Sequence, residues 1–377
     1  MSLILTRLKE KYIELRGFHT NRKLIVIESD DWGSIRTPSR KTLDKLISLG
    51  DNLDQDVFLR NDCLESEEDI LQLLKTLSEI KDNQGRSAIM TMNFAMANPN
   101  FEDISLNNGV YAHEPFYVTY DKYYGKNNIL LNIKNGYNKG YILPQLHCRE
   151  HMNVNRWMKD LQKGVPHVIM AYENNMIGVG KSFSKNNIFG YMDAFNTDNS
   201  TDMELEEIVR EANKMFEETF GYVSETFVAP CFVWNKALEQ ALHKIGIKYI
   251  QTSPWQYIPK GSNGKYLLKH RLHYTGEQNK EKQFYSVRNC IFEPAYTNDY
   301  QGSAEKCLLE IERAFRAKKP AVITSHRLNY IGSIQKENRE KSLIWLKWLL
   351  ENVLKKYPSV EFISSAELFT IMTQEKT

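Results

Sequence analysis

The chain lacks several features that mark other classes of protein. No apolar run approaches the about 18 residues that a membrane helix needs. The N-terminus, MSLILTRLKEKYIELRG, reaches Arg7 after a few apolar residues, so it predicts an amphipathic helix and not a signal peptide. The five cysteines form no CxxC pair, which argues against a disulfide framework or a cysteine-rich zinc site. We therefore expect a reduced, cytoplasmic protein without a membrane span.

An excess of charge of either sign is also missing. Lys and Arg total 49 and Asp and Glu total 47, so the formal net charge is +2. This balance argues against a nucleic acid or an acidic membrane as a partner bound through bulk charge. No internal repeat, low-complexity segment or Pro/Gly/Ser linker marks a boundary, so we expect one catalytic domain over residues 1–377. The sequence carries no signal for an oligomeric state.

What the chain does contain is an alternation of short apolar runs and helical stretches. The runs cover residues 24–28, 88–92, 141–146, 226–229, 247–250, 321–323 and 360–363, with a further strand expected over 283–292. Helical periodicity covers 66–80, 202–220, 236–245, 303–317 and 341–356. Such alternation predicts a parallel sheet, either a closed barrel or an open doubly wound sheet. About seven strands over the whole length favour a seven-stranded (β/α) barrel.

Two stretches fit this alternation poorly. Residues 95–140 are rich in Asn and Tyr, and residues 164–200 are rich in Asn, Gly and Phe. Both follow expected strand ends and are too long for simple connections. We interpret them as insertions that border the active site.

Polar residues follow the strands at the end where a barrel enzyme places its catalytic groups. Asp30 and Asp31 come directly after an apolar run, and adjacent carboxylates are costly to bury without a cation or hydrogen bonds. The alternative is an ordinary polar loop with a helix cap. His326 follows a late strand and is a candidate general acid or base, although a lone histidine is more often structural.

His147 and His151 follow another strand, four residues apart. On a helical turn they would share one face and suit a zinc ion. The order is not HExxH, because Cys148 occupies the position of the metalloprotease base. With one carboxylate of the Asp pair, the two imidazoles supply the ligand count of an open catalytic metal site. Surface histidines without a metal are the alternative.

These motifs in this order resemble the polysaccharide deacetylase family, the metal-dependent carbohydrate esterases with a NodB-type distorted (β/α) barrel. The resemblance runs over residues 24–369. It implies that Asp30 is the catalytic base and His326 the general acid. It also implies that one divalent ion, with Zn²⁺ the expected metal, is held by three ligands: Asp31, His147 and His151.

The chain departs from the family pattern in two places. Where the family has RxPY, this chain has Val-Ala-Pro-Cys at 228–231, so the Arg that holds the base is missing and only the backbone N–H of Cys231 remains for the oxyanion. The family's Asp before Trp is replaced in Ser253-Pro254-Trp255. We expect Cys231 and Trp255 to contact substrate and suggest Glu293 as the partner of His326.

The sequence thus predicts a metal-dependent hydrolase that removes an acetyl group from an acetylated carbohydrate. Two alternatives stay open. The same fold could hydrolyse another C–N bond or a glycosidic bond, or the barrel could bind glycans without catalysis.

Overall fold

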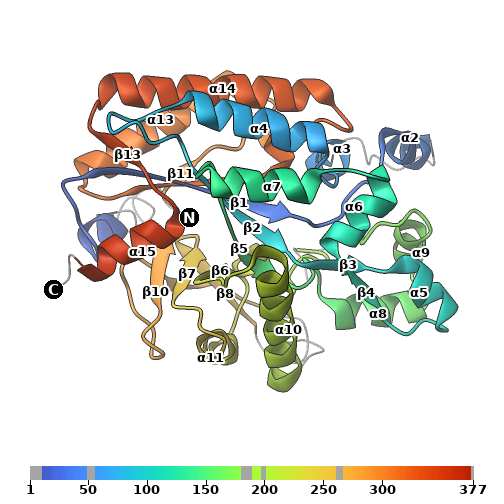
Figure 1. The fold of residues 1–377 in the computed structure, drawn as a ribbon. Helices are drawn as coiled ribbons and strands as arrows, with labels where there is room; N and C mark the ends of the chain where they lie inside the picture. Colours follow the sequence, from blue (N-terminus) through green and yellow to red (C-terminus); the bar gives the residue numbers. More distant parts are fainter. Residues whose placement is uncertain (1–10, 49–55, 180–188, 197–200, 260–265, 375–377) are drawn as a thin grey trace.

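The centre of the molecule is a curled, parallel sheet of nine strands (Figure 1). The computed structural model describes residues 11–48, 56–179, 189–196, 201–259 and 266–374. The strands of this sheet are β1 (Lys23–Trp32), β2 (Met90–Ala95), β5 (Ile142–Cys148), β6 (Thr226–Val228), β7 (Tyr249–Thr252), β10 (Phe284–Val287), β11 (Cys290–Ile291), β12 (Ala321–His326) and β13 (Val360–Phe362). Their order is β10-β7-β6-β5-β2-β1-β12-β11, and β13 pairs with the first residues of β1.

The two edges of the sheet are joined by one short piece of chain. β10 pairs with β7, whereas β11, which begins three residues after the end of β10, pairs with β12. Between them, the Arg288 N–H donates to the carbonyl of Thr252 and the Asn289 N–H to that of Val322. The chain therefore changes neighbours within two residues and closes the sheet into a distorted barrel. Because β10 and β11 share one position, the barrel has the seven positions that the sequence predicted.

The predicted strands form this barrel with one difference: the strand expected over 283–292 takes the position expected for residues 360–363. Residues 360–363 were expected among the seven strands, but among the described strands β13 pairs with β1 alone, over Lys23–Ile25. The seventh position is taken by the further strand expected over 283–292. β13 is too short to pair beyond this corner, whereas residues 284–291 span the gap between β7 and β12.

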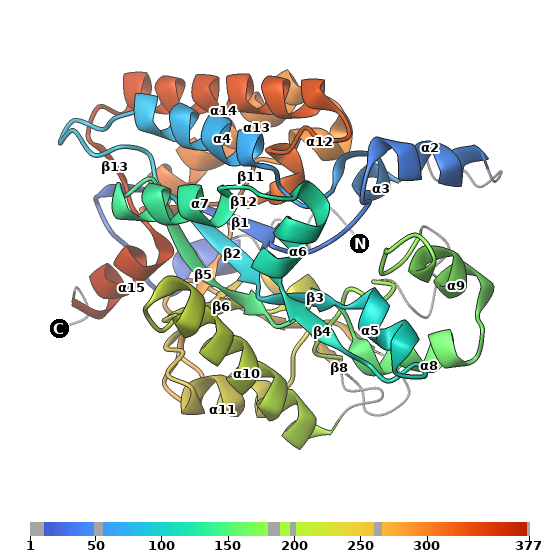
Figure 2. The same ribbon diagram turned by 45° about the vertical axis from the view of Figure 1, so that its right-hand side comes forward.

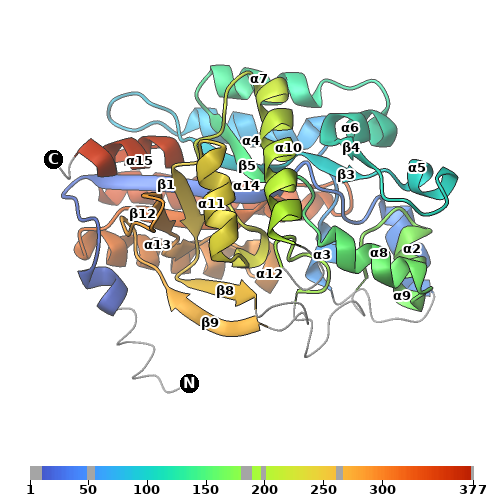
Figure 3. The ribbon, with the colours of Figure 1, turned by 90° about the horizontal axis from the view of Figure 1, so that it is seen from below.

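Helices surround the barrel. They are α2 (Arg40–Ser48), α3 (Val57–Asn61), α4 (Glu67–Glu79), α5 (Phe101–Leu106), α6 (Phe116–Tyr124), α7 (Ile129–Asn138), α8 (Val154–Gln162), α9 (Pro166–Tyr172), α10 (Asp202–Phe220), α11 (Lys236–Lys244), α12 (Pro294–Thr297), α13 (Tyr300–Arg316), α14 (Lys336–Lys356) and α15 (Ser365–Gln374). α4, α13 and α14 pack together on one side, and α10 and α11 lie on the other (Figures 1 and 3). Their apolar faces form one large core with the strands.

The helix starts show how far local sequence decides an element. α4 and α10 begin at the predicted places, because Ser66 with Asp69 and Thr201 with Glu204 form capping boxes. α14 begins at Lys336, five residues before the predicted start. Its first turns bury polar residues such as Arg339, so the apolar periodicity did not reveal them.

Several short elements gather at the end of the barrel toward which β1 points. They include α2, α3, α5, α8 and α9 (Figure 2) and the hairpin of β3 (Ala97–Pro99) and β4 (His113–Pro115). Parts of both stretches expected to be insertions therefore lie at this end; of the second stretch, residues 180–188 and 197–200 are outside the described residues. A second hairpin, β8 (Trp255–Pro259) with β9 (Tyr266–Leu272), lies at the bottom of the view in Figure 3.

Of the expected N-terminal amphipathic helix, residues 1–10 lie outside the described part, and residues 11–15 are helical. Among the helices that the structure describes, none combines the length and the apolar character required to span a bilayer.

Candidate metal centre

Asp31, His147 and His151 converge at the carboxyl end of the barrel strands. The Oδ1 atom of Asp31 lies 3.0 Å from His151 Nε2 and 3.5 Å from His147 Nε2. All three side chains are buried, and one ligand atom from each lies within 4.8 Å of the others. The structure thus brings together the three residues that the sequence assigned to a metal.

The local backbone explains how Asp31 reaches this position. The pairing of β1 with β2 shifts register between Ser29 and Trp32, and Asp31 adopts a left-handed conformation with φ of 74°. Such a conformation in a non-glycine residue costs about 1–3 kcal/mol and persists where its surroundings enforce it. The bulge turns adjacent carboxylates in different directions, so Asp30 and Asp31 have separate partners.

The route by which the two histidines meet differs from the prediction. We expected both on one helical turn, but His147 is in strand β5 and His151 lies in the bend after it. Asn153 caps α8 by accepting the N–H of Arg156, so the helix starts only at Val154. The rings nevertheless meet, with centroids 4.8 Å apart, because the bend folds back across the strand end.

The hydrogen bonds of His147 define its tautomer. Its Nδ1 lies 2.7 Å from the carbonyl oxygen of Val228, which can only accept, so Nδ1 carries the proton. Nε2 is then a bare acceptor that faces the Asp31 carboxylate, and among the described residues neither Nε2 nor Asp31 Oδ1 has a hydrogen-bond partner. Two buried acceptors facing each other repel, unless a cation lies between them.

The charge states of Asp31 and His151 also fit a metal site. Burial alone would raise the pKa of Asp31, but the rings of His151 and His147 and the Arg36 guanidinium hold it well below 3.8. Burial lowers the pKa of His151 below 6.5, so its ring is neutral at pH 7. An ionised carboxylate and neutral imidazoles are the forms that bind metal ions.

Asp30 has a different environment from its neighbour. Arg288 Nη1 donates to its Oδ2 at 2.6 Å, Arg288 Nη2 to its Oδ1 at 2.8 Å, and Asn93 to its Oδ1 at 2.7 Å. Burial raises the pKa of Asp30, but Arg288 outweighs it and lowers that pKa to about 2. Asp30 is therefore an ionised acceptor at the edge of the site.

His326 is paired with a carboxylate. Its Nδ1 donates to Glu293 Oε1 at 2.5 Å, and Asn329 donates to the other oxygen of Glu293. Burial would lower the pKa of His326, but Glu293 outweighs it and raises that pKa to about 9. The imidazole is thus protonated at neutral pH and able to give up a proton. Glu293 is the partner that we suggested from its place at a strand end.

A cavity of about 350 Å³ joins these groups. It is lined by Asp30, Asp31, His147, His151, Cys231 and His326 together with apolar and aromatic side chains such as Phe58, Ile177, Phe189 and Tyr296. Residues 177–179, Phe189, Tyr191 and Met192 from the second long stretch contribute to its wall. No described residue of 95–140 lines it.

The two residues expected to contact substrate differ in position. Cys231 lines the cavity from the 3₁₀ turn η3 (Pro230–Phe232), where its φ is 55°. Trp255 begins β8, and the described lining of the cavity does not include it. After β7 the Ser253 hydroxyl accepts the Trp255 N–H, and this turn leads the chain into the β8–β9 hairpin.

Sequence reasoning missed two arginines of the site. Arg288 comes from the segment that closes the barrel, and its guanidinium binds Asp30 in place of the Arg that is missing from residues 228–231. The available signal in the sequence was a single Arg in an apolar strand. Arg36 also lines the cavity, with Nη2 3.5 Å from Asp31 Oδ2. Arg36 follows Asp30 and Asp31 closely in the sequence, but the direction of its side chain depends on the turn after β1.

Comparisons with known proteins place this chain in a family. The model of glycosyl hydrolase family 57 matches residues 189–377. No curated protein matches the chain.

Solved structures with similar folds include a Mycobacterium smegmatis protein assigned to the polysaccharide deacetylases, at 9% identity and TM-score 0.46, covering 96% of this chain and 94% of that one. A branching enzyme of the family 57 type from Pyrococcus horikoshii has 10% identity and TM-score 0.43, covering 93% and 70%. A 4-alpha-glucanotransferase from Thermococcus litoralis has 10% identity and TM-score 0.40, covering 93% and 40%. At these values the superpositions assign no activity.

The family match corrects the resemblance drawn from the motifs. Identification as a polysaccharide deacetylase was wrong, because the matching family is glycosyl hydrolase family 57. Three short motifs report the chemistry of a strand-end site, which different families can share, whereas the family model compares a continuous half of the chain. The chain belongs to glycosyl hydrolase family 57 and is a carbohydrate-active hydrolase.

Proposed function

We propose that this protein is a hydrolase that depends on a divalent metal, with Zn²⁺ the expected ion, and that it removes an acyl group such as acetyl from a carbohydrate. The observation that carries the proposal is the buried pair of acceptors, Asp31 Oδ1 and His147 Nε2, which face each other at 3.5 Å and have no hydrogen-bond partner in the part of the chain that the structure describes. Asp31, His147 and His151 would hold the ion. When bound, a divalent ion supplies Lewis-acid polarisation of a carbonyl and increases the acidity of water.

The remaining groups of the cavity fit hydrolysis of an acyl bond. Asp30 is ionised and would accept the proton of the attacking water, while Arg288 and Asn93 keep its carboxylate in place. His326 is protonated and would give its proton to the leaving amine or alcohol, while Glu293 keeps the ring oriented. Base and acid thus have opposite charge states at pH 7, as this chemistry requires.

Cleavage of a glycosidic bond is the second candidate, and the family match favours it. That reaction commonly uses a pair of carboxyl groups, one of them held protonated. In this cavity the pKa values of Asp30 and Asp31 both lie below their ordinary values, so neither carboxyl is kept protonated. The proposal of acyl hydrolysis rests on this difference together with the convergence of Asp31, His147 and His151.

The test separates these activities by their products. The metal content of the purified chain is measured first, and the metal-loaded protein is then incubated with an N-acetylated oligosaccharide, an O-acetylated xylan and an unmodified α-glucan. We expect acetate from an acetylated substrate, no new reducing ends, and loss of activity on chelation. New reducing ends without acetate would establish glycosidic cleavage instead. Glycan binding without either product would establish a non-catalytic barrel.

A further inference from the structure

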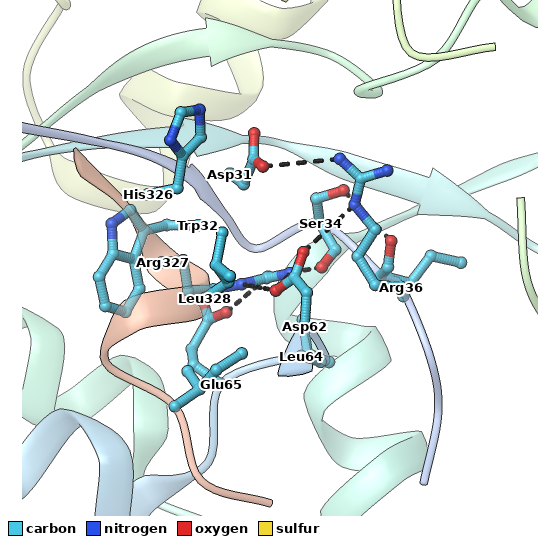
Figure 4. A network of polar contacts seen from close by, with 12 residues as sticks. Asp31, Trp32, Ser34, Arg36, Asp62, Leu64, Glu65, His326, Arg327 and Leu328 are labelled. Atoms are coloured by element: carbon cyan, nitrogen blue, oxygen red, sulfur yellow. Dashed lines mark hydrogen bonds and ion pairs between the residues drawn. The ribbon is translucent and has the colours of Figure 1, made fainter. Parts of the chain in front are cut away.

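Arg36 contacts the candidate metal ligand Asp31 from the side opposite the imidazoles. Its Nη2 lies 3.5 Å from Asp31 Oδ2 (Figure 4). The other oxygen, Asp31 Oδ1, faces the two histidines. The Arg36 side chain is 13% exposed and lines the cavity. One oxygen of the carboxylate is thus occupied by a guanidinium, and the other is directed at the place between the rings.

Arg36 is itself positioned by an ion pair with Asp62. Its Nε lies 3.2 Å from Asp62 Oδ2, and the Asp62 side chain is fully buried. The other oxygen of Asp62 accepts from Arg327 Nε and Nη2, at 3.1 and 2.8 Å. The Arg36 guanidinium also lies over the ring of Phe58, 5.2 Å from its centroid. These contacts fix the direction in which the guanidinium points.

The turn that carries Arg36 is fastened by the same network (Figure 4). Arg327 Nη1 donates to the Ser34 carbonyl at 2.5 Å and to Glu65 Oε2 at 2.9 Å. Glu65 Oε1 accepts the Gly33 N–H at 2.8 Å. The turn after β1 is therefore tied to the α3–α4 connection and to the residue after His326, which explains how the left-handed Asp31 is maintained.

We propose that Arg36, held by Asp62, is a positioning residue that orients the Asp31 carboxylate toward His147 and His151 and so sets the affinity of the site for a divalent ion. The inference rests on the proposed function, because it needs the metal. Groups that hydrogen-bond or pair with metal ligands usually contribute about 10–100-fold to metal affinity. A guanidinium close to a dication also repels it, and this effect has the opposite sign. The measured direction of the change therefore decides between orientation and repulsion.

The test measures binding of Zn²⁺ and Co²⁺ alone to the full chain. Dissociation constants come from competition with a chelating indicator, and the visible absorption of bound Co²⁺ reports the coordination geometry. We expect Arg36→Gln to weaken binding about 10–100-fold. Arg36→Lys should give an intermediate loss with an altered Co²⁺ spectrum, because Lys keeps the charge without the planar fork. The matched control is Arg40→Gln, which removes an exposed arginine paired with Asp44.

Equal or tighter binding by folded Arg36→Gln would overturn the inference, because any gain from orientation would then not exceed the repulsion. If loss of one of the two arginine partners of buried Asp62 prevents Arg36→Gln from folding, Arg36→Lys decides. An unchanged affinity and spectrum in that variant would overturn the inference as well. Failure of the wild-type chain to bind either ion would instead refute the proposed metal site. The two failures are thus distinguishable.

Discussion

Arg288 donates hydrogen bonds to both oxygens of Asp30, from Nη1 to Oδ2 at 2.6 Å and from Nη2 to Oδ1 at 2.8 Å. The two residues are 258 positions apart in the chain. The same guanidinium donates through Nε to Glu28 at 2.7 Å. Arg288 lies where the chain passes from β7 to β12, so closing the barrel and holding the candidate base are achieved by one residue. This arrangement motivates the first prediction.

Arg288→Lys should lower kcat and shift the acidic limb of the pH–rate profile upward. Lys retains a charge but cannot donate to both Asp30 oxygens, so the pKa of Asp30 should rise from about 2 toward its ordinary value. An ionised Asp30 is then lost as the pH falls through that higher value. The measurement is kcat/KM for acetate release over roughly four pH units that span the ordinary carboxyl pKa values. An acidic limb identical to that of the wild type would show that Arg288 does not tune Asp30.

The adjacent aspartates should differ in their effect on metal content. Asp31→Asn should lose both metal and activity, because Asp31 Oδ1 faces the imidazoles. Asp30→Asn should retain the metal and lose about 10²–10⁴-fold in kcat, the usual effect of removing a general base. Elemental analysis of both variants beside activity checks this. Retention of metal in Asp31→Asn with loss in Asp30→Asn would reverse the two roles.

His326 and Glu293 should control the alkaline limb of the profile. A group whose pKa is raised to about 9 stays protonated below that pH, so the acid form is available at neutral pH and is lost above about pH 9. His326→Ala should lower kcat about 10²–10⁴-fold, most for substrates with poor leaving groups, without loss of metal. Full activity in this variant would remove His326 from the mechanism.

Glu293→Gln should move that alkaline limb to lower pH. The neutral amide no longer favours the imidazolium, so the pKa of His326 should fall, while the amide oxygen still accepts from Nδ1. The shift in the pH profile distinguishes tuning from simple loss of structure, and the thermal midpoint serves as the control. A reduced rate with an unshifted limb would argue that Glu293 only packs the site.

Buried ion pairs between helices α4 and α14 should contribute more to the free energy of unfolding than exposed pairs between the same helices. Arg339 on α14 pairs with Asp69 on α4 at 2.7 Å, and their side chains are 6% and 0% exposed. Arg339→Ala should lower the free energy of unfolding by about 3–5 kcal/mol, because it removes the guanidinium paired with the buried Asp69 carboxylate, which keeps only uncharged donors such as Ser66 among the described residues. Lys347→Ala breaks an exposed pair with Glu79 between the same two helices and should change it far less. Equal losses in denaturant titrations of the two variants would contradict this.

The sequence by itself predicted much of the architecture. Apolar runs followed by helical periodicity gave the barrel, because buried parallel strands and amphipathic helices leave strong local patterns. The capping boxes at Ser66 and Thr201 located two helix starts, since a cap depends on residues three apart. The polar residues at the ends of β1, β5 and β12 also pointed to one site, because parallel strands bring their carboxyl ends to the same edge.

Only the tertiary structure decided the partners within that site. Arg288 reaches Asp30 because residues 284–291 close the barrel, and pairing across 258 residues leaves no local pattern. The tautomer of His147 depends on the carbonyl of Val228 in the neighbouring strand. The direction of Asp31 depends on a bulge and on a buried network through Arg36 and Asp62. Local sequence selects the elements and the residue types at their ends, whereas packing of distant segments fixes which atoms face one another and in which charge state.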